Sequence, residues 1–278
     1  MSKVDNKHEK FVEALKKING EFKNGDISLL KDITNVDVPT IDSGSLVLNT
    51  ILGGGLAQGR IIEIYGAEAS GKTSIALTAI GNVQRQGGTA VFIDAEQALD
   101  PRYAQKLGVD LNSLGFSQAI IAEDVMKLVQ DMCESGAVDI IVVDSIASLI
   151  PRAEFNEEGF DKVSISLVAR LMSKALRKIA VVANRNNCTV ILLNQTRANI
   201  GVMYGPNTVT PGGNALKFFA SQRIEVKRRG KVEEDGEIIG NEIFLRCIKN
   251  KIAPPYAEGM TVVSFNKGIN RSAELFKL

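Results

Sequence analysis

The decisive stretch of this chain is Gly66-Ala67-Glu68-Ala69-Ser70-Gly71-Lys72-Thr73. It matches the phosphate-binding loop pattern G-x-x-x-x-G-K-[ST] at every fixed position. The apolar run Arg60–Tyr65 precedes it, and a helix-favouring run begins at Ser74 directly after it. In such a strand–loop–helix setting, the backbone N–H groups of the turn and the helix N-terminus both point at a phosphate. The pattern predicts a nucleoside triphosphate site, with Lys72 on the β- and γ-phosphates and the Thr73 hydroxyl on Mg²⁺.

The bulk composition limits the remaining possibilities. With 278 residues, the chain is long enough for one large α/β domain with a small appendage. Its net charge of +1 predicts no polyanion partner, so any nucleic-acid surface must come from local clustering. His8 is the only histidine, which excludes His-based triads and His metal clusters. The three cysteines, Cys133, Cys188 and Cys247, lack metal-ligand spacing, and we expect them to be buried, reduced thiols of a cytoplasmic protein. The polar N-terminus predicts no signal peptide, and no apolar run is long enough to predict a membrane span.

Apolar runs alternate with helical patterns through the middle of the chain. The predicted strands are Arg60–Tyr65, Thr89–Asp94, Asp139–Asp144 and Thr189–Asn194, and the predicted helices are Thr73–Gln86, Ala122–Glu134 and Ile165–Arg185. This order predicts an α/β phosphate-loop fold with a mainly parallel sheet covered by helices on both faces. After Ala220 the runs Gln222–Arg228, Glu242–Lys249 and Thr261–Phe265 follow one another without helices. We expect them to extend the same sheet in antiparallel fashion.

The N-terminal segment has a different pattern. Phe11, Leu15, Ile18 and Phe22 recur at helical spacing from about Lys7 to Phe22. A short extended segment, residues 36–41, contains Pro39, which favours a sheet edge. We therefore expect a helix–strand arm over residues 1–41 and an ATPase core over residues 42–278.

Polar side chains end the apolar runs, at the sheet edge where ligands bind in such folds. Asp144 ends one run and is expected to hold Mg²⁺ through its water shell, opposite Thr73. Asp94 and Glu96 end another run, and either could activate the water that attacks the γ-phosphate. Spacing alone leaves these two carboxylates as alternatives. Gln195 could sense the γ-phosphate, and it opens the long loop Thr196–Pro211, a length typical of functional loops.

Several segments together resemble a known family, the bacterial RecA recombinases. The matching segments are Gly66–Thr73, Phe92–Pro101, Val138–Ser145, Gly212–Phe218, Ile200–Gly205 and Ile248–Ala253. The resemblance extends from about Val36 to the C-terminus and more loosely through the N-terminal helix. It implies an ATP-dependent recombinase that forms a head-to-tail helical filament on single-stranded DNA. Such a protein pairs this strand with homologous double-stranded DNA and exchanges strands in recombination and repair, with DNA-stimulated, Mg²⁺-dependent ATP hydrolysis.

The resemblance also implies roles for nucleotide-site residues. Glu96 corresponds to the carboxylate that activates water, which decides between the two candidates above. Asp100 and Tyr103 correspond to residues that hold the adenine, the tyrosine by stacking. Gln195 corresponds to the γ-phosphate sensor. Lys249 and Lys251 resemble a pair that reaches the ATP of the neighbouring subunit and neutralises charge in the transition state.

For DNA, the resemblance implies two binding loops, about residues 154–164 and 196–211. Arg170, Ser173 and Arg177 have the i, i+3, i+7 spacing of a single helical face, as expected for a stripe that follows phosphates. Ile165 and Ile200 would insert between bases. The other residues implied are Arg197, Gly212, Gly213 and Asn214 at the DNA backbone and Phe218 at the subunit interface.

Two features remain outside these roles. A basic run contains Arg223, Lys227, Arg228, Arg229 and Lys231. A solvated turn is the favoured interpretation of this run, and a second DNA-binding groove is the alternative. The sequence stops at Leu278, about where the family's core ends, so we expect the family's C-terminal domain to be absent.

Two other functions fit the same core. One is an ATP-gated recombination mediator that coats or caps DNA without exchanging strands. Glu96, Lys249 and Lys251 argue against an inactive ATPase of that kind. The other is a ring-forming helicase. The long N-terminal arm and the Gly212–Phe218 segment favour the recombinase.

Overall fold

The computed structural model of the chain describes residues 3–21, 27, 29, 37–157, 165–198, 208–209 and 211–275. The chain divides into two units, Met1–Val38 and Pro39–Leu278. The first unit contains helix α1 (Lys3–Glu21), which begins four residues before the predicted start at Lys7. Strand β1 (Thr40–Ile41) pairs with β2 (Leu56–Ala57) and so belongs to the second unit, although the prediction assigned residues up to 41 to the arm.

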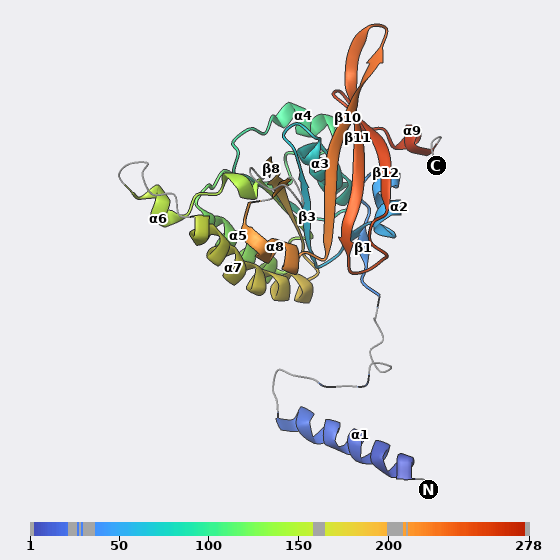
Figure 1. Ribbon diagram of the computed structural model, residues 1–278, viewed down its shortest axis with the longest axis vertical. Helices are drawn as coiled ribbons and strands as arrows, with labels where there is room; N and C mark the ends of the chain where they lie inside the picture. The colour runs from blue at the N-terminus through green and yellow to red at the C-terminus, as the bar shows by residue number, and fades with distance from the viewer. Residues whose placement is uncertain are drawn as a thin grey trace. The chain divides into compact units, whose positions relative to one another are not determined.

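The second unit is built on a nine-stranded sheet (Figure 1). Its strands, in order across the sheet, are β13 (Gly268–Ile269), β12 (Glu258–Ser264), β11 (Glu237–Asn250), β10 (Gln222–Glu234), β3 (Ile61–Gly66), β7 (Thr189–Gln195), β6 (Ile140–Asp144), β4 (Ala90–Asp94) and β5 (Leu114–Ser117). Strands β10, β3, β7, β6, β4 and β5 are parallel, and β10 to β13 continue the sheet in antiparallel pairs. The predicted α/β class and antiparallel extension are confirmed.

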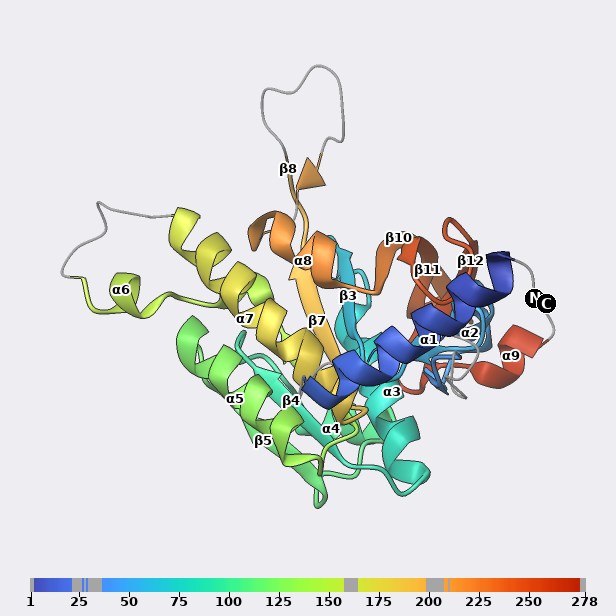
Figure 2. The same cartoon turned by 90° about the horizontal axis from the view of Figure 1, so that it is seen from below.

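Two helical layers explain why the central strands are apolar throughout. One apolar cluster packs α2 (Leu46–Leu52), α3 (Lys72–Arg85) and α4 (Pro101–Lys106) against one face of the sheet. A second packs α5 (Ala122–Ser135), α7 (Ile165–Arg185) and α8 (Gly213–Phe219) against the other, as Figure 2 shows. With both faces covered, every residue of β6 is buried, so its side chains do not alternate in polarity.

Local rules account for the helical periods. In α5 the buried residues Ala122, Val125, Met126, Val129 and Cys133 follow the helical period, so one stripe faces the sheet. The predicted bounds of α3, α5 and α7 agree with the structure within one residue. The remaining short elements are η2 (Ile146–Ser148), α6 (Arg152–Phe155), β8 (Arg197–Ala198), β9 (Thr208–Val209) and α9 (Arg271–Leu275).

Strands β10 and β11 form a long hairpin that projects beyond the rest of the second unit (Figure 1). Asp235 and Gly236 connect them, with φ of 50° and 81°. Positive φ at both central residues is the requirement of the tight turn that matches strand twist, and Asp-Gly satisfies it. The interpretation of the basic run as a solvated turn is therefore wrong, because residues 223–231 lie within β10. Arg223 in that run is mostly buried against Glu63.

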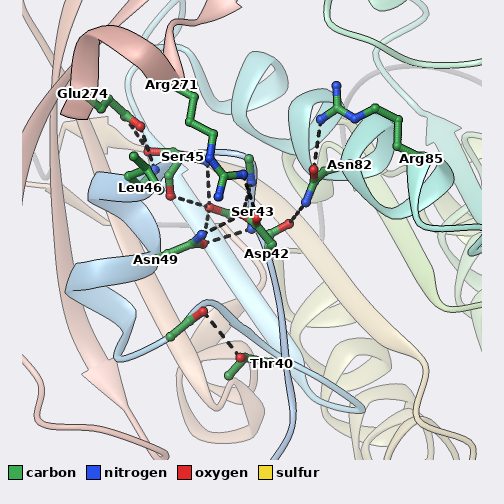
Figure 3. Close-up of polar contacts among 12 residues, drawn as sticks. Thr40, Asp42, Ser43, Ser45, Leu46, Asn49, Asn82, Arg85, Arg271 and Glu274 are labelled. Carbon is green, nitrogen blue, oxygen red and sulfur yellow. Dashed lines mark hydrogen bonds and ion pairs between the residues drawn. The ribbon is translucent and has the colours of Figure 1, made fainter.

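A polar cluster joins the last helix to α2 (Figure 3). Glu274 of α9 is buried and accepts hydrogen bonds from the Ser45 hydroxyl and the Leu46 N–H, at 2.7 and 2.6 Å. Nearby, Asp42 accepts from Asn49 and from Arg271, at 2.6 and 2.7 Å. These bonds satisfy the N-terminal end of α2 and hold α9 against it.

Two further predictions concern cysteines and membranes. Cys133, Cys188 and Cys247 are free and buried, as expected. Among the helices in the described part of the chain, none is long and apolar enough to span a membrane.

Candidate functional site

A cleft of about 200 Å³ lies where the parallel strands end. Gly66, Asp94, Asp144 and Gln195 are the final residues of β3, β4, β6 and β7. The cleft is lined by Glu68, Ala69, Ser70, Gly71, Lys72, Thr73, Ser74, Glu96, Tyr103, Asp144, Gln195, Asn241, Ile243, Val263 and Phe265. The strand order thus gathers most of the predicted nucleotide-site residues at one place.

The loop before α3 has the backbone form of an anion site. Ala69 and Gly71 have φ of 54° and 98°, a left-handed conformation that turns successive N–H groups toward one side. Gly71 is the N-cap of α3 and no described side chain caps it, so the first helical N–H groups face the cleft without a side-chain acceptor. The buried Ser70 hydroxyl has no hydrogen-bond partner among the described residues. A buried orphan donor beside uncapped helix N–H groups fits a bound phosphate.

Lys72 lies in the same loop and is buried. Its ammonium donates to the carbonyl oxygens of Ala67 and Gly66, at 2.7 and 3.2 Å. Burial lowers the pKa of Lys72, while the charges of Asp144, Glu96 and Glu68 oppose that shift. A buried cation that is hydrogen-bonded, within the described part of the chain, only to loop carbonyls is well placed to neutralise a phosphate.

Thr73 and Asp144 face each other across the cleft floor. The Thr73 hydroxyl donates to Asp144 Oδ2 at 2.6 Å. Burial raises the pKa of Asp144 to about 6, although the Thr73 bond lowers it and the charge of Glu96 raises it further. A hydroxyl and a carboxylate form an oxygen donor set of the kind that Mg²⁺ prefers, and a divalent cation would offset the cost of burying the Asp144 charge.

The two candidate bases are in different environments. The Asp94 carboxylate is buried and accepts the N–H groups of Ala98 and Leu99, at 3.2 and 3.1 Å. Glu96 lies in the cleft lining, where its Oε1 accepts from the Ser145 hydroxyl at 2.5 Å and from Gln195 Nε2 at 2.8 Å. Both bonds go to one oxygen, so Oε2 stays available for a water molecule. The geometry favours Glu96 over Asp94 as the base.

Tyr103 lies in the cleft lining, and Asp100, which does not line the cleft, starts the helix that carries Tyr103. Tyr103 shares a 2.7 Å hydrogen bond with the Ser74 hydroxyl of α3. Asp100 is the N-cap of α4, and its carboxylate accepts the Arg102 N–H at 2.8 Å. The cap and Pro101 at the first turn start the helix that carries Tyr103.

Four lining residues were not predicted from the sequence. Asn241 and Ile243 come from β11, Val263 from β12, and Phe265 directly follows β12. Ile243 and Val263 supply an apolar wall beside Gly71 of the phosphate loop, Phe265 adds an aromatic ring, and Asn241 adds an amide. Their placement depends on how the hairpin pairs with β3, and local sequence spacing does not contain that information.

A second hollow, of about 500 Å³, lies on the outer face of α7. Arg170, Ser173 and Arg177 line it together, as the helical spacing predicts. Lys174 and Lys178 also line it and were missed, although both are four residues from a neighbour in the same stripe. Five exposed polar side chains, four of them cationic, make this surface well suited to a phosphate backbone.

Helix α8 packs beside this surface. Gly212 and Gly213 have φ of 88° and 70°, and a Cβ on Gly213 would come within 3.0 Å of the Ala169 Cβ on α7. Glycine is therefore required both by conformation and by the close approach. Asn214 on the first turn is exposed, and Phe218 is 72% exposed.

Lys249 and Lys251 do not belong to the lining of their own chain's cleft. The Lys249 ammonium donates to the carbonyl oxygens of Lys217 and Phe218 at the end of α8, at 2.7 and 2.9 Å. Burial lowers the pKa of Lys249, and the charges of Lys251 and Arg223 lower it further. Lys251 is exposed.

Several predicted residues lie outside what the structure describes. Ile200 and most of both predicted DNA loops fall there, and so do the side chains of Ile165 and Arg197.

Comparison with known proteins agrees with this architecture. A family model described as the RecA N-terminal domain matches residues 9–270. Protein RecA of Acinetobacter baylyi is 48% identical over 275 residues, which cover 99% of this chain and 78% of that protein. Protein RecA of Thermotoga petrophila is 48% identical over 278 residues, with the same coverage. Protein RecA of Thermotoga maritima is 48% identical over 268 residues, or 96% of this chain and 75% of that protein.

Proposed function

The chain belongs to the RecA family, whose members are recombinases of DNA repair, and we propose that it is an ATP-dependent enzyme that assembles on single-stranded DNA. In this proposal it hydrolyses ATP when bound to DNA and pairs the strand with homologous double-stranded DNA. The observation that carries the proposal is the meeting of Lys72, Thr73, Glu96 and Gln195 in one cleft, with loop 196–211 starting from the last of them.

The phosphate loop and α3 hold the nucleotide. Gly66–Gly71 and Ser74 surround the phosphates with main-chain N–H groups and hydroxyls, and Lys72 leaves its loop carbonyls for the β- and γ-phosphates. Asp100, Tyr103 and the newly identified Phe265 are assigned to the adenine. Thr73 would hold Mg²⁺ directly and Asp144 through water, and a bound Mg²⁺ supplies neutralisation of charge on the transferred group.

Glu96 performs the proton chemistry. Ser145 and Gln195 fix one carboxylate oxygen, so the other can accept a proton from the attacking water. When a γ-phosphate is present, Gln195 has a second acceptor close by and can change partners. Since Gln195 opens loop 196–211, this exchange connects the nucleotide to the DNA-facing part of the protein.

The α7 stripe is the main phosphate-binding surface in this proposal. Arg170, Ser173, Arg177, Lys174 and Lys178 contact the DNA backbone, which makes binding independent of sequence. Arg197, Gly212, Gly213 and Asn214 add contacts from the second loop and α8, while Ile165 and Ile200 separate bases.

Assembly completes the ATP site. We assign Lys249 and Lys251 to the ATP of the neighbouring subunit, and Phe218 and the N-terminal arm to the interface. Both lysines lie outside the lining of their own cleft, and Phe218 is exposed, which supports a role in trans. A head-to-tail interface of this kind generates a helical filament when it does not close. A cytoplasmic location is part of the proposal.

An ATPase assay with and without single-stranded DNA, followed by a strand-exchange assay, tests this function. We expect hydrolysis to rise with DNA and labelled strands to be exchanged in the presence of ATP. A rate of ATP hydrolysis that is unchanged by DNA would contradict the proposed DNA-dependent ATPase activity. DNA binding without exchange would identify a mediator, and closed hexamers that unwind duplex would identify a helicase.

A further inference from the structure

Glu63 is an unusual residue for the middle of a core strand. It lies on the same face of β3 as Ile61, the face that α7 and α8 cover, and its side chain is 0% exposed. Its carboxylate pairs with Arg223 on β10 at 2.5 Å, and the guanidinium also lies 4.8 Å from the centre of the Tyr65 ring. A buried carboxylate persists only when its oxygens are fully partnered.

The second Glu63 oxygen is partnered by Asn194, at the end of β7. Asn194 Nδ2 donates to Glu63 Oε1 at 3.1 Å and to the Pro211 carbonyl at 3.0 Å. Its Oδ1 accepts the Gln195 N–H, also at 3.0 Å. The side chain is fully buried, and both of its donor hydrogens and its oxygen are engaged.

These bonds join the two ends of loop 196–211. Gln195 immediately precedes the loop and Pro211 is its last residue. The Thr196 N–H donates to the Gly66 carbonyl at 3.2 Å, so the start of the loop is also attached to the start of the phosphate loop. Gly212, Gly213 and Asn214 follow Pro211 directly, and a displacement of Pro211 must therefore move them.

We propose that Asn194 is a positioning residue that couples the nucleotide site to the DNA surface by tying Pro211 to Glu63 and Gln195. This inference rests on the proposed function. When Gln195 moves toward a γ-phosphate, the Asn194 side chain transmits the shift to the Pro211 carbonyl. Because coupling between two ligands is reciprocal, single-stranded DNA strengthens nucleotide binding through the same residue.

The coupling is measured as a ratio of affinities. The dissociation constant for a fluorescent single-stranded oligonucleotide is determined with and without a non-hydrolysable ATP analogue, for the wild type and for Asn194→Ala. The coupling ratio is the dissociation constant without the analogue divided by the dissociation constant with it. We expect this ratio to be about tenfold smaller in Asn194→Ala than in the wild type, a change typical of residues within a coupling network. Analogue affinity without DNA should change less than about threefold, because Asn194 does not line the cleft.

A double variant separates the bond to Pro211 from the stability of the core. In Asn194→Asp with Glu63→Gln the net charge is unchanged. The glutamine introduced at position 63 can accept from Arg223 and can donate to the aspartate at position 194, which reverses the direction of the native bond. The aspartate has no donor for Pro211 and turns an oxygen toward its carbonyl oxygen, so the native contact is lost. We expect this double variant to melt above Asn194→Ala, which leaves a Glu63 oxygen unpartnered, while losing the coupling in the same way. Wild-type coupling in either folded variant would overturn the proposal.

Asn186→Ala is the matched control, since Asn186 also donates to a backbone carbonyl, that of Cys133 at 2.8 Å, and lies in the turn before β7, away from the cleft. It should lower the melting temperature and leave the coupling ratio intact. Amide hydrogen exchange of the wild type, with and without the analogue, gives a second test. Adding the analogue should change the protection of the Gly212–Leu216 amides, and unchanged protection would also overturn the proposal. A wild type with no ATP-dependent DNA binding would instead refute the proposed function.

Discussion

Glu96 shows how much a single carboxylate depends on its neighbours. Two donors, the hydroxyl of Ser145 and the amide of Gln195, bind the same oxygen of this cleft-lining residue, which leaves its second oxygen available. Asp94, two residues away, has both oxygens engaged by the backbone of the following turn. One carboxylate thus shapes the loop, and the other is available for proton transfer.

Glu96→Gln should therefore separate binding from hydrolysis. The variant keeps the side-chain size but cannot accept the proton of the attacking water, and we expect kcat to fall roughly 10²- to 10⁴-fold. ATP binding should persist, and the protein should remain bound to single-stranded DNA in the presence of ATP. Steady-state ATPase and filter binding measure both, and normal turnover would exclude Glu96 as the base.

At this scale the sequence predicted the residues that belong to a contiguous pattern. Lys72 and Thr73 follow from the phosphate-loop motif, and Asp144 follows from its position at a strand end. Spacing could not choose between Asp94 and Glu96, because their hydrogen bonds depend on Ser145, Gln195 and a local turn. Phe265 was missed because nothing near it in the sequence indicates that β12 ends at the cleft.

Helix α7 is the element to which we assign the main contacts with DNA. Its buried face packs on the sheet through residues such as Met172 and Leu176, and its outer face presents the cationic stripe. Helical periodicity fixes both faces at once, which is why the stripe was predictable from residues 170, 173 and 177 alone. The Asp235-Gly236 pair is an equally clear turn signal in the sequence, and it places the turn after the basic run, which lies within β10.

Arg177→Ala tests the role of the stripe through salt dependence. Removing one phosphate contact should reduce the slope of log K against log salt by about 0.7 for single-stranded DNA. Fluorescence titrations over a range of salt concentrations provide the slope. Lys127→Ala is the control, since Lys127 is an exposed cation on α5 that pairs with Asp131. An equal effect of both variants would mean that only net charge matters.

Asp42, which accepts hydrogen bonds from Asn49 of α2 and Arg271 of α9, makes the stability of the protein depend on pH. Burial alone would raise the pKa of Asp42, but hydrogen bonds from Asn49 and the Gly44 N–H, together with Arg271, hold it below its ordinary value of 3.8. A carboxyl group whose pKa is lower in the folded state stabilises the protein at pH values above its unfolded pKa. This stabilisation is lost as the pH falls toward and through the folded-state pKa.

Asp42→Asn should therefore cost stability near neutral pH and progressively less in acid. We expect the difference in free energy of unfolding between wild type and variant to be larger at about pH 6 than at about pH 3. Urea unfolding at both values measures it. Asp131→Asn, which alters an exposed aspartate on α5, provides the comparison, and a pH-independent difference would contradict the assignment.

The second unit is organised around one end of the strands of its nine-stranded sheet. The buried parallel strands place the residues of the proposed nucleotide site there. Strands β11 and β12, from the antiparallel part of the sheet, supply one wall of the cleft. The sequence predicted this class of fold because continuous apolar strands alternate with helices. It could not predict the register of the hairpin against β3, which depends on pairing between residues far apart in the chain, such as Gln222 with Ile62.

Mixing two inactive variants tests most directly the claim that ATP is hydrolysed at a site shared by neighbouring subunits on DNA. One variant is Glu96→Gln, and the other carries Lys249→Ala and Lys251→Ala. In an equal mixture, about a quarter of head-to-tail contacts pair an intact Glu96 with intact lysines, so DNA-stimulated ATPase should return to roughly a quarter of the wild-type rate. A mixture no more active than its separate components would contradict the account.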